Sequence, residues 1–210
     1  MKKIITIIGS VLLALSVNAQ EPRTISLNVY GGYTFMDRVR FDAAYADVQG
    51  GFQWGAGLEY FPTRDNSVEL KYQRMDTDFP LFLYNGTEIN KGNQSGAINL
   101  ITIGGNHYFS GAVNDAKIIP FIGGALGVGI LDGPENSATK FAWDAQAGIK
   151  IPTKSVASFK LRAYIQSVTS TFGTDFWYYP GWGTYAVPDY VTMFQFGLGG
   201  TVTFDFNKKK

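Results

Sequence analysis

The sequence predicts an all-β fold, an eight-stranded antiparallel up-and-down barrel, and three observations lead to it. Segments in which apolar and polar residues alternate recur along the chain, and alternation with period two is typical of strands with two different faces. The connections between them alternate in length, as in up-and-down barrels. Of 210 residues, 25 are glycine and 15% are aromatic, which suits close-packed strands and tight turns. The predicted strands are 25–35, 52–61, 68–73, 97–109, 118–131, 141–151, 159–166 and 194–206.

The N-terminus predicts export. Lys2 and Lys3 precede a mostly apolar stretch, 4–17, and small residues then stand at positions suited to cleavage after Ala19. This is the pattern of a secretory signal peptide. A membrane anchor is the alternative, but the apolar stretch is shorter than the roughly 20 residues that a spanning helix needs. We therefore expect a signal peptide at 1–19 and one barrel domain at 20–210.

The connections differ at the two ends of the predicted barrel. The short ones are 62–66, 110–116 and 152–156, and the others, mostly longer, are 37–50, 76–95, 132–139 and 169–190. Short turns at one end and longer loops at the other are typical of barrels that span an outer membrane. The mature N-terminus lies at the short-turn end, so we expect that end to face the periplasm.

The two faces of the segments bear on whether the barrel is soluble or spans a membrane. One face carries large apolar groups such as Trp54 and Phe159, and the other carries full charges. A soluble barrel would turn its apolar face inward, whereas a membrane barrel turns it to lipid and keeps a polar interior. Aromatic residues near segment ends, such as Tyr60 and Phe61, and segments long enough to cross a bilayer favour the membrane. For 97–109, the alternation does not decide which residues face the interior and which face outward.

The overall composition excludes several classes of partner and site. The formal net charge is +1, so no strong field attracts nucleic acid, and we expect no nucleic-acid partner. The chain has no cysteine, which excludes disulfides, thiolate zinc sites and cysteine nucleophiles. We expect no cofactor, no metal and no cofactor-binding residues.

Three motifs carry a resemblance to a known family. The stretches "NVYGGYTF", "PFIGGALGVGI" and "GLGGTVTFDF", together with the predicted signal peptide, resemble the small eight-stranded outer-membrane β-barrel family, which includes the transmembrane domain of the major outer-membrane protein A. The resemblance covers 20–210. It implies a bacterial outer membrane, contact with outer-membrane lipid and lipopolysaccharide, and insertion by the outer-membrane assembly machinery. Family members commonly end on the final aromatic residue, whereas Asn207 and three lysines follow Phe206 here, so recognition by that machinery is expected to be less standard.

Charged residues on the polar faces form a predicted lumen charge network. Eight strands make a barrel whose interior is nearly filled by side chains, so opposite charges should pair there. Asp144 is the first expected partner of Arg162, because their strands are predicted neighbours. A polar plug that closes the barrel is one interpretation, and a narrow ion path is the other. The network comprises Glu59, Glu69, Lys71, Asp144, Lys150, Lys160 and Arg162.

The stretch 171–190 is rich in aromatic residues and is expected to be an external loop. Clusters of exposed aromatic side chains often mark interaction surfaces, so this loop is a candidate for binding a surface ligand. Packing against 79–85, or a place among the aromatic residues at the membrane boundary, is the alternative. The candidate residues are Phe176, Trp177, Tyr178, Tyr179, Trp182 and Tyr185.

Catalysis has little support in the sequence. Some eight-stranded barrels are lipid A-modifying enzymes with a histidine and a serine at the outer rim, but His107, the only histidine, lies at the predicted periplasmic end. The stretch 123–129 is glycine-rich but has no following helix to bind phosphate. We expect no enzyme and no catalytic residues. The expected role is structural or surface interaction; a small porin-like pore of low conductance and a soluble periplasmic ligand-binding barrel are the alternatives.

Overall fold

The computed structural model describes residues 24–40, 44–92, 94–109, 118–133, 137–153, 157–179 and 183–206. For 170–179 and 183–191 it describes the backbone only. The expected signal peptide, 1–19, lies outside the described residues. Among the residues that are described, no helix is long and apolar enough to cross a membrane.

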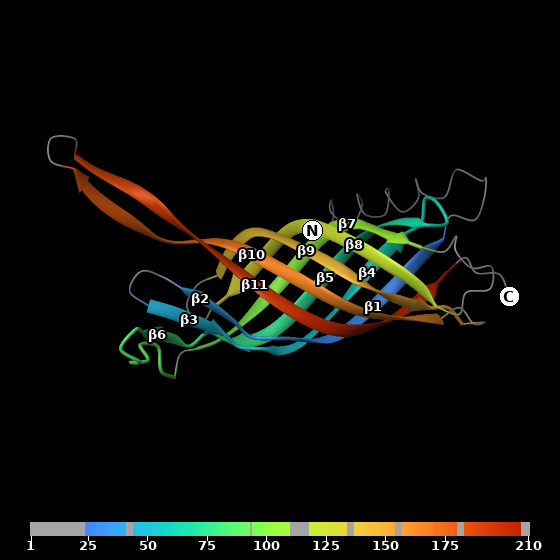
Figure 1. The fold of residues 1–210 in the computed structure, drawn as a ribbon, viewed down its shortest axis with the longest axis horizontal. Coiled ribbons are helices and arrows are strands. Elements are labelled where there is room, and N and C mark those ends of the chain that lie inside the picture. Colours follow the sequence, from blue (N-terminus) through green and yellow to red (C-terminus); the bar gives the residue numbers. More distant parts are fainter. Residues whose placement is uncertain are drawn as a thin grey trace, which may run out of the picture.

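Eight strands close into one antiparallel barrel (Figure 1). They are β1 (Ile25–Thr34), β4 (Gly51–Tyr60), β5 (Asn66–Asp78), β7 (Ser95–Tyr108), β8 (Ile119–Asp132), β9 (Ser137–Ile151), β10 (Ala157–Tyr179) and β11 (Gly183–Asp205). Their order around the barrel is β1-β11-β10-β9-β8-β7-β5-β4, and β1 closes it by pairing with both β11 and β4. Each predicted segment corresponds to one of these strands, so the predicted fold class is confirmed.

The register also settles the facing of β7, which the sequence left open. Directly opposed residues on neighbouring strands share a face of the sheet. Lys71 pairs with Thr102, and both are buried in the lumen, whereas Leu70 pairs with Ile103, and both are exposed on the outside. Thr102 and Asn106 of β7 therefore face the lumen, and its isoleucines at 101 and 103 face outward.

The lengths of the connections do not divide between the two ends as predicted. At the end that we call the turn end, β4 joins β5 through 61–65 and β9 joins β10 through 152–156. At the opposite end, the loop end, the prediction of a longer connection at 132–139 is wrong, because β8 and β9 extend to leave only 133–136 between them.

The predicted loop at 169–190 is also wrong, because these residues lengthen β10 and β11. Pairing of β10 with β9 ends at Thr169 and Phe141, but pairing with β11 continues to Tyr179 and Gly183. The result is a two-stranded extension, the outer ribbon (171–179 and 183–190), which projects beyond the barrel (Figure 1). Aromatic residues favour strands, and this stretch is rich in them.

A second, small sheet lies at the loop end and was not predicted. Its strands are β2 (Asp37–Arg40), β3 (Ala44–Val48) and β6 (Leu81–Leu83), in the order β2-β3-β6. Arg38 binds Asp47 across β2 and β3 through two hydrogen bonds of 2.6 and 3.0 Å, and this contact raises the pKa of Arg38. A backbone hydrogen bond of 2.8 Å from Phe194 to the Asp37 carboxylate attaches the sheet to β11. Two of the expected loops, 37–50 and 76–95, thus contain paired strands.

Candidate functional site

The lumen charge network lies inside the barrel, on β4, β5, β9 and β10. Six of its seven side chains are at most 6% exposed: Glu59, Glu69, Lys71, Asp144, Lys160 and Arg162. Lys150 is half-buried near the turn end, where its Nζ lies 5.1 Å from the ring centre of Phe61 and 5.5 Å from that of Tyr108. The six fully buried groups comprise three cations and three carboxylates, so their formal charges cancel.

Glu59 and Lys160 form the first buried ion pair, with 2.6 Å between Oε2 and Nζ. The Glu59 carboxylate accepts four further hydrogen bonds, of 2.5 to 3.1 Å. Their donors are Ser67, Tyr108, Asn28 and Asn106. A buried charge is costly unless it is both paired and hydrogen-bonded, and this carboxylate is both.

Lys71 and Asp144 form the second pair, 2.5 Å apart. They come from β5 and β9, which are separated in the barrel wall by β7 and β8, so the pair reaches across the interior. The expected pairing of Asp144 with Arg162 is wrong. The register places Asp144 opposite Gln166 and Arg162 opposite Gly148. Asp144 and Gly148 are four positions apart on β9, roughly 13 Å along the strand.

Arg162 instead lies between two aromatic rings. Its guanidinium carbon is 4.6 Å from the ring centres of both Tyr30 and Tyr164, and its Nη1 donates to Gln146 at 3.0 Å. The Tyr30 hydroxyl donates to Glu69, so Tyr30 connects the cation to the third carboxylate. Within the described part of the chain, Arg162 Nε has no hydrogen-bond partner. Arg162 is therefore held by ring faces and an amide, without a direct ion pair to any residue that the structure describes.

Neutral amides cross the lumen toward the loop end. Gln53 donates to Gln166 at 2.9 Å, and Gln166 donates to Gln195 at 3.1 Å. The Thr34 hydroxyl lies 2.8 Å from the hydroxyl of Tyr164 and donates to Gln53 at 3.1 Å. These side chains come from β1, β4, β10 and β11, so they tie four strands together in one polar layer.

An apolar layer fills the lumen beyond these amides. Its members face inward near the loop end of their strands, and two valines of the small sheet pack onto them. The sequence contained a signal for this layer: on β5 the inward positions change from Gln73 to Met75, and on β10 from Gln166 to Val168. The predicted segments 68–73 and 159–166 end before Met75 and Val168, so the layer was not predicted. The layer comprises Met75, Ile98, Leu100, Ala142, Val168 and Met193 with Val39 and Val48.

The aromatic candidates for surface interaction fall on the outer ribbon. Phe176, Trp177, Tyr178 and Tyr179 belong to β10, and Tyr185 belongs to β11, opposite Trp177. Trp182 lies outside the described residues. The segment 79–85, expected as an alternative packing partner, contains β6, and the Phe82 ring there stacks on Tyr45 at 5.3 Å.

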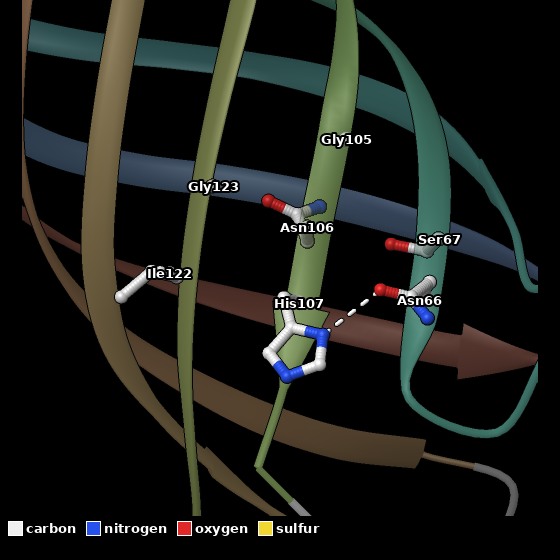
Figure 2. A pocket seen from close by; sticks show the side chains of 7 residues that line it. All are labelled: Asn66, Ser67, Gly105, Asn106, His107, Ile122 and Gly123. Carbon is white, nitrogen blue, oxygen red and sulfur yellow. Dashed lines mark hydrogen bonds between the residues drawn. The ribbon is translucent and has the colours of Figure 1, made fainter.

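His107 is exposed on the outside of the barrel near the turn end. Its Nδ1 lies 2.8 Å from the Asn66 amide oxygen, and its ring meets Phe109 edge-on at 4.8 Å. A pocket of about 350 Å³ adjoins it, lined by residues of β5, β7 and β8 (Figure 2). No group of three or more histidine, aspartate or glutamate side chains suited to a metal ion occurs within the described ranges.

Comparison with known proteins adds evidence at the level of the fold. No protein-family profile matches the sequence, and no curated protein does. The crystal structure of Neisserial surface protein A is similar, with a TM-score of 0.52 and 11% identity over 87% of this chain and 97% of that one. The outer membrane protein OprG from Pseudomonas aeruginosa has a TM-score of 0.50 and 14% identity over 89% of this chain and 99% of that one.

The chain has the fold of a small outer-membrane β-barrel. The resemblance on the sequence motifs is therefore confirmed as a likeness of fold. Identities of 11% and 14% carry no residue role across, because unrelated functions share such folds. The role of this barrel must be argued from its own side chains.

Proposed function

We propose that the protein is an integral β-barrel of a bacterial outer membrane, with a closed lumen and a structural or surface-interaction role. One observation carries the proposal, the inverted distribution of side chains. Phe52, Leu126 and Phe196 are 60% to 64% exposed on the outside, while the ion pairs of Glu59 and Asp144 are buried inside. Water would penalise so large an apolar surface, whereas lipid favours it.

The same distribution argues against a soluble periplasmic ligand-binding barrel. Such a barrel would place large apolar side chains inside, around its ligand, and charges outside. Here the polar layer and the two ion pairs occupy the interior up to the apolar layer near the loop end. Membrane fractionation tests the choice: we expect the protein to sediment with outer membranes and to need detergent for extraction. Release with the periplasmic fraction would overturn the proposal.

A closed lumen is supported by three barriers in series. An ion entering from the turn end meets the pair of Lys160 and Glu59, then the amide layer, and at the loop end the apolar layer. A continuous apolar constriction opposes ion passage because it does not hold water. We expect purified protein in planar lipid bilayers to conduct only at background level.

The small pore is the runner-up, and one observation favours it. Several buried lumen atoms of the described residues have no hydrogen-bond partner, among them Gln73 Nε2, Arg162 Nε and Thr201 Oγ1. Buried polar groups of this kind commonly bind ordered water, and a chain of such waters would begin a conducting path. Stable single-channel steps from wild-type protein would favour the pore over the plug.

We propose that surface interaction involves the loop end and that the protein is not an enzyme. The outer ribbon and the small sheet both lie there (Figure 1), and the ribbon carries the aromatic candidates of 171–190. Lipopolysaccharide and an external ligand are the proposed contacts, and the assembly machinery is the proposed partner during insertion. Deleting 172–188 should abolish binding to a surface ligand and leave the barrel inserted.

A further inference from the structure

Two glycines leave the outer wall of the barrel bare between β7 and β8. Gly105 and Gly124 are paired across these strands, and both are exposed on the outside. Val68 lies opposite Gly105 on β5, and Ala145 lies opposite Gly124 on β9. We call these four residues the glycine row. Gly105 and Gly124 have no side chain and Ala145 has a small one, so the wall forms a shallow groove on β7, β8 and β9 that Val68, 47% exposed on β5, borders.

The groove has an apolar side and a polar side. Toward the loop end, the next outward row is Leu70, Ile103, Leu126 and Trp143. Toward the turn end, the next row begins with Asn66 and His107 and continues with Ile122. Large apolar groups thus border the groove on the side toward the barrel's middle, and an amide with an imidazole border it on the other.

The pocket of about 350 Å³ lies at this polar border. Gly105, Ile122, Asn66 and His107 all line it, and Figure 2 shows Asn66 and His107 farther toward the strand ends than Gly105. The Asn66 amide oxygen accepts from His107 Nδ1, and its nitrogen donates to Thr63 Oγ1 at 3.1 Å. His107 Nε2 has no partner among the described residues, so it is available to a ligand.

A second outward glycine pair shows what is unusual about this groove. Gly31 and Gly200 are paired across β1 and β11, but the Phe52 ring covers Gly31, lying 3.4 Å from where a Cβ would stand. At Gly105 and Gly124 the nearest atoms to such a Cβ are backbone oxygens, at 3.3 and 3.5 Å. Among the described residues, only these backbone oxygens lie within 4 Å of the two positions.

We propose that the groove binds a membrane phospholipid, with one acyl chain over the glycine row and the phosphoglycerol part at Asn66 and His107. The inference rests on the proposed membrane location. The order of the rows carries it: apolar groups toward the bilayer centre and hydrogen-bonding groups toward the boundary match the order of groups within one lipid molecule. The second N–H of the Asn66 amide suits ester and phosphate oxygens, which accept hydrogen bonds, and His107 Nε2, which accepts when Nδ1 donates to Asn66, suits a hydroxyl of the headgroup. The occupant belongs to the leaflet next to the turn end.

Photo-crosslinking tests the site. Full-length mature protein is reconstituted in vesicles of phosphatidylethanolamine and phosphatidylglycerol that contain a phosphatidylglycerol with a diazirine on one acyl chain. After irradiation, labelled peptides are mapped by mass spectrometry. We expect labels to concentrate on β7 and β8 around Gly105 and Ile122. Even labelling of all outward faces would overturn the site and leave the membrane location standing, whereas no labelling of the barrel would refute the membrane location itself.

A matched pair of variants separates the groove from general lipid contact. Gly124→Leu fills the groove and should lower labelling there about threefold, because packing contacts rather than the hydrophobic effect hold apolar groups together within a bilayer. Gly200→Leu is the control, since it is also an outward glycine and the nearest atom to its Cβ would be 3.9 Å away. Equal labelling at the groove in both variants would overturn the proposal. If either variant fails to fold, the distribution of labelled peptides in the wild-type protein still tests the site.

A second probe tests the contact of the lipid headgroup with Asn66 and His107. A diacylglycerol probe with the same diazirine chain lacks the phosphate, so it should label the groove less than the phospholipid probe. His107→Ala should reduce that difference, and His107→Gln, which keeps a hydrogen-bonding group, should preserve part of it. If both probes label wild type equally, the headgroup contact at His107 is absent.

Discussion

The half of the lumen nearest the turn end and the half at the loop end stand on the same eight strands but are filled by different side chains. The first contains ion pairs such as Lys160 with Glu59, surrounded by hydrogen bonds. The second contains the apolar layer, capped by Val39 and Val48 from the small sheet. Buried charges specify their partners, because an unpaired one is costly, whereas apolar side chains require only that the space be filled. The lumen of one barrel can thus be closed by specific ion pairs at one end and by apolar packing at the other.

The largest effect is expected from breaking an ion pair. Lys160→Met leaves the Glu59 carboxylate buried without its cation, which should lower the free energy of unfolding by about 3 to 5 kcal/mol. Urea titration of protein in lipid vesicles measures the loss. Lys150→Met is the control, since Lys150 is only half-buried near the turn end. Adding Glu59→Gln to Lys160→Met should recover part of the stability, and the absence of any recovery would contradict the pairing.

A smaller effect is expected in the apolar layer. Leu100→Ala removes packing at a fully enclosed position and should cost about 3 kcal/mol. Leu161→Ala is its control, because Leu161 is exposed on the outside and lipid can fill the space it leaves. Leu100→Asn extends the comparison to conduction: a polar group in this layer should admit water and raise the conductance in planar bilayers. Unchanged conductance would show that the layer is not the barrier.

The contrast between the inside and the outside of the wall can be tested at glycines. A Cβ at Gly197 would overlap the ring of Tyr164, which its hydrogen bond to Thr34 holds in place. Gly197→Ala should therefore cost about 1 to 3 kcal/mol by overpacking. At Gly200, on the outer face of the same strand, the nearest atom would be 3.9 Å away, and Gly200→Ala should stay within about 0.5 kcal/mol of wild type. Equal costs would contradict the facing of β11.

The smallest effect is expected in the small sheet. Phe82→Leu removes the stacked contact with Tyr45 and should cost about 1 kcal/mol locally. Hydrogen exchange at the amides of β3 and β6 should become faster, while urea unfolding of the barrel should not change. A matching loss in barrel stability would mean that the sheet supports the apolar layer more than its two valines suggest.

The strands and the facing of most of them could be predicted from the sequence because each depends on local alternation. Period two placed Glu69 and Lys71 on one face and Leu70 on the other, and the structure agrees. The outer ribbon was not predicted, since 169–190 was assigned to a loop. The partners of the charges could not be predicted, because Lys71 and Asp144 belong to strands that are not neighbours.

The sequence by itself determined eight alternating strands, each with a polar and an apolar face, since the side-chain period of a strand follows from backbone geometry alone. Aromatic residues near the segment ends then favoured a barrel with its apolar faces outside. Only the tertiary structure decided which charges meet. Closing the barrel sets the depth of each strand relative to all others, and that depth placed Asp144 against Lys71 and left Arg162 between two tyrosine rings. It likewise decided that Val39 and Val48 cap the lumen, because that contact joins a connecting segment to strands that are distant in the sequence.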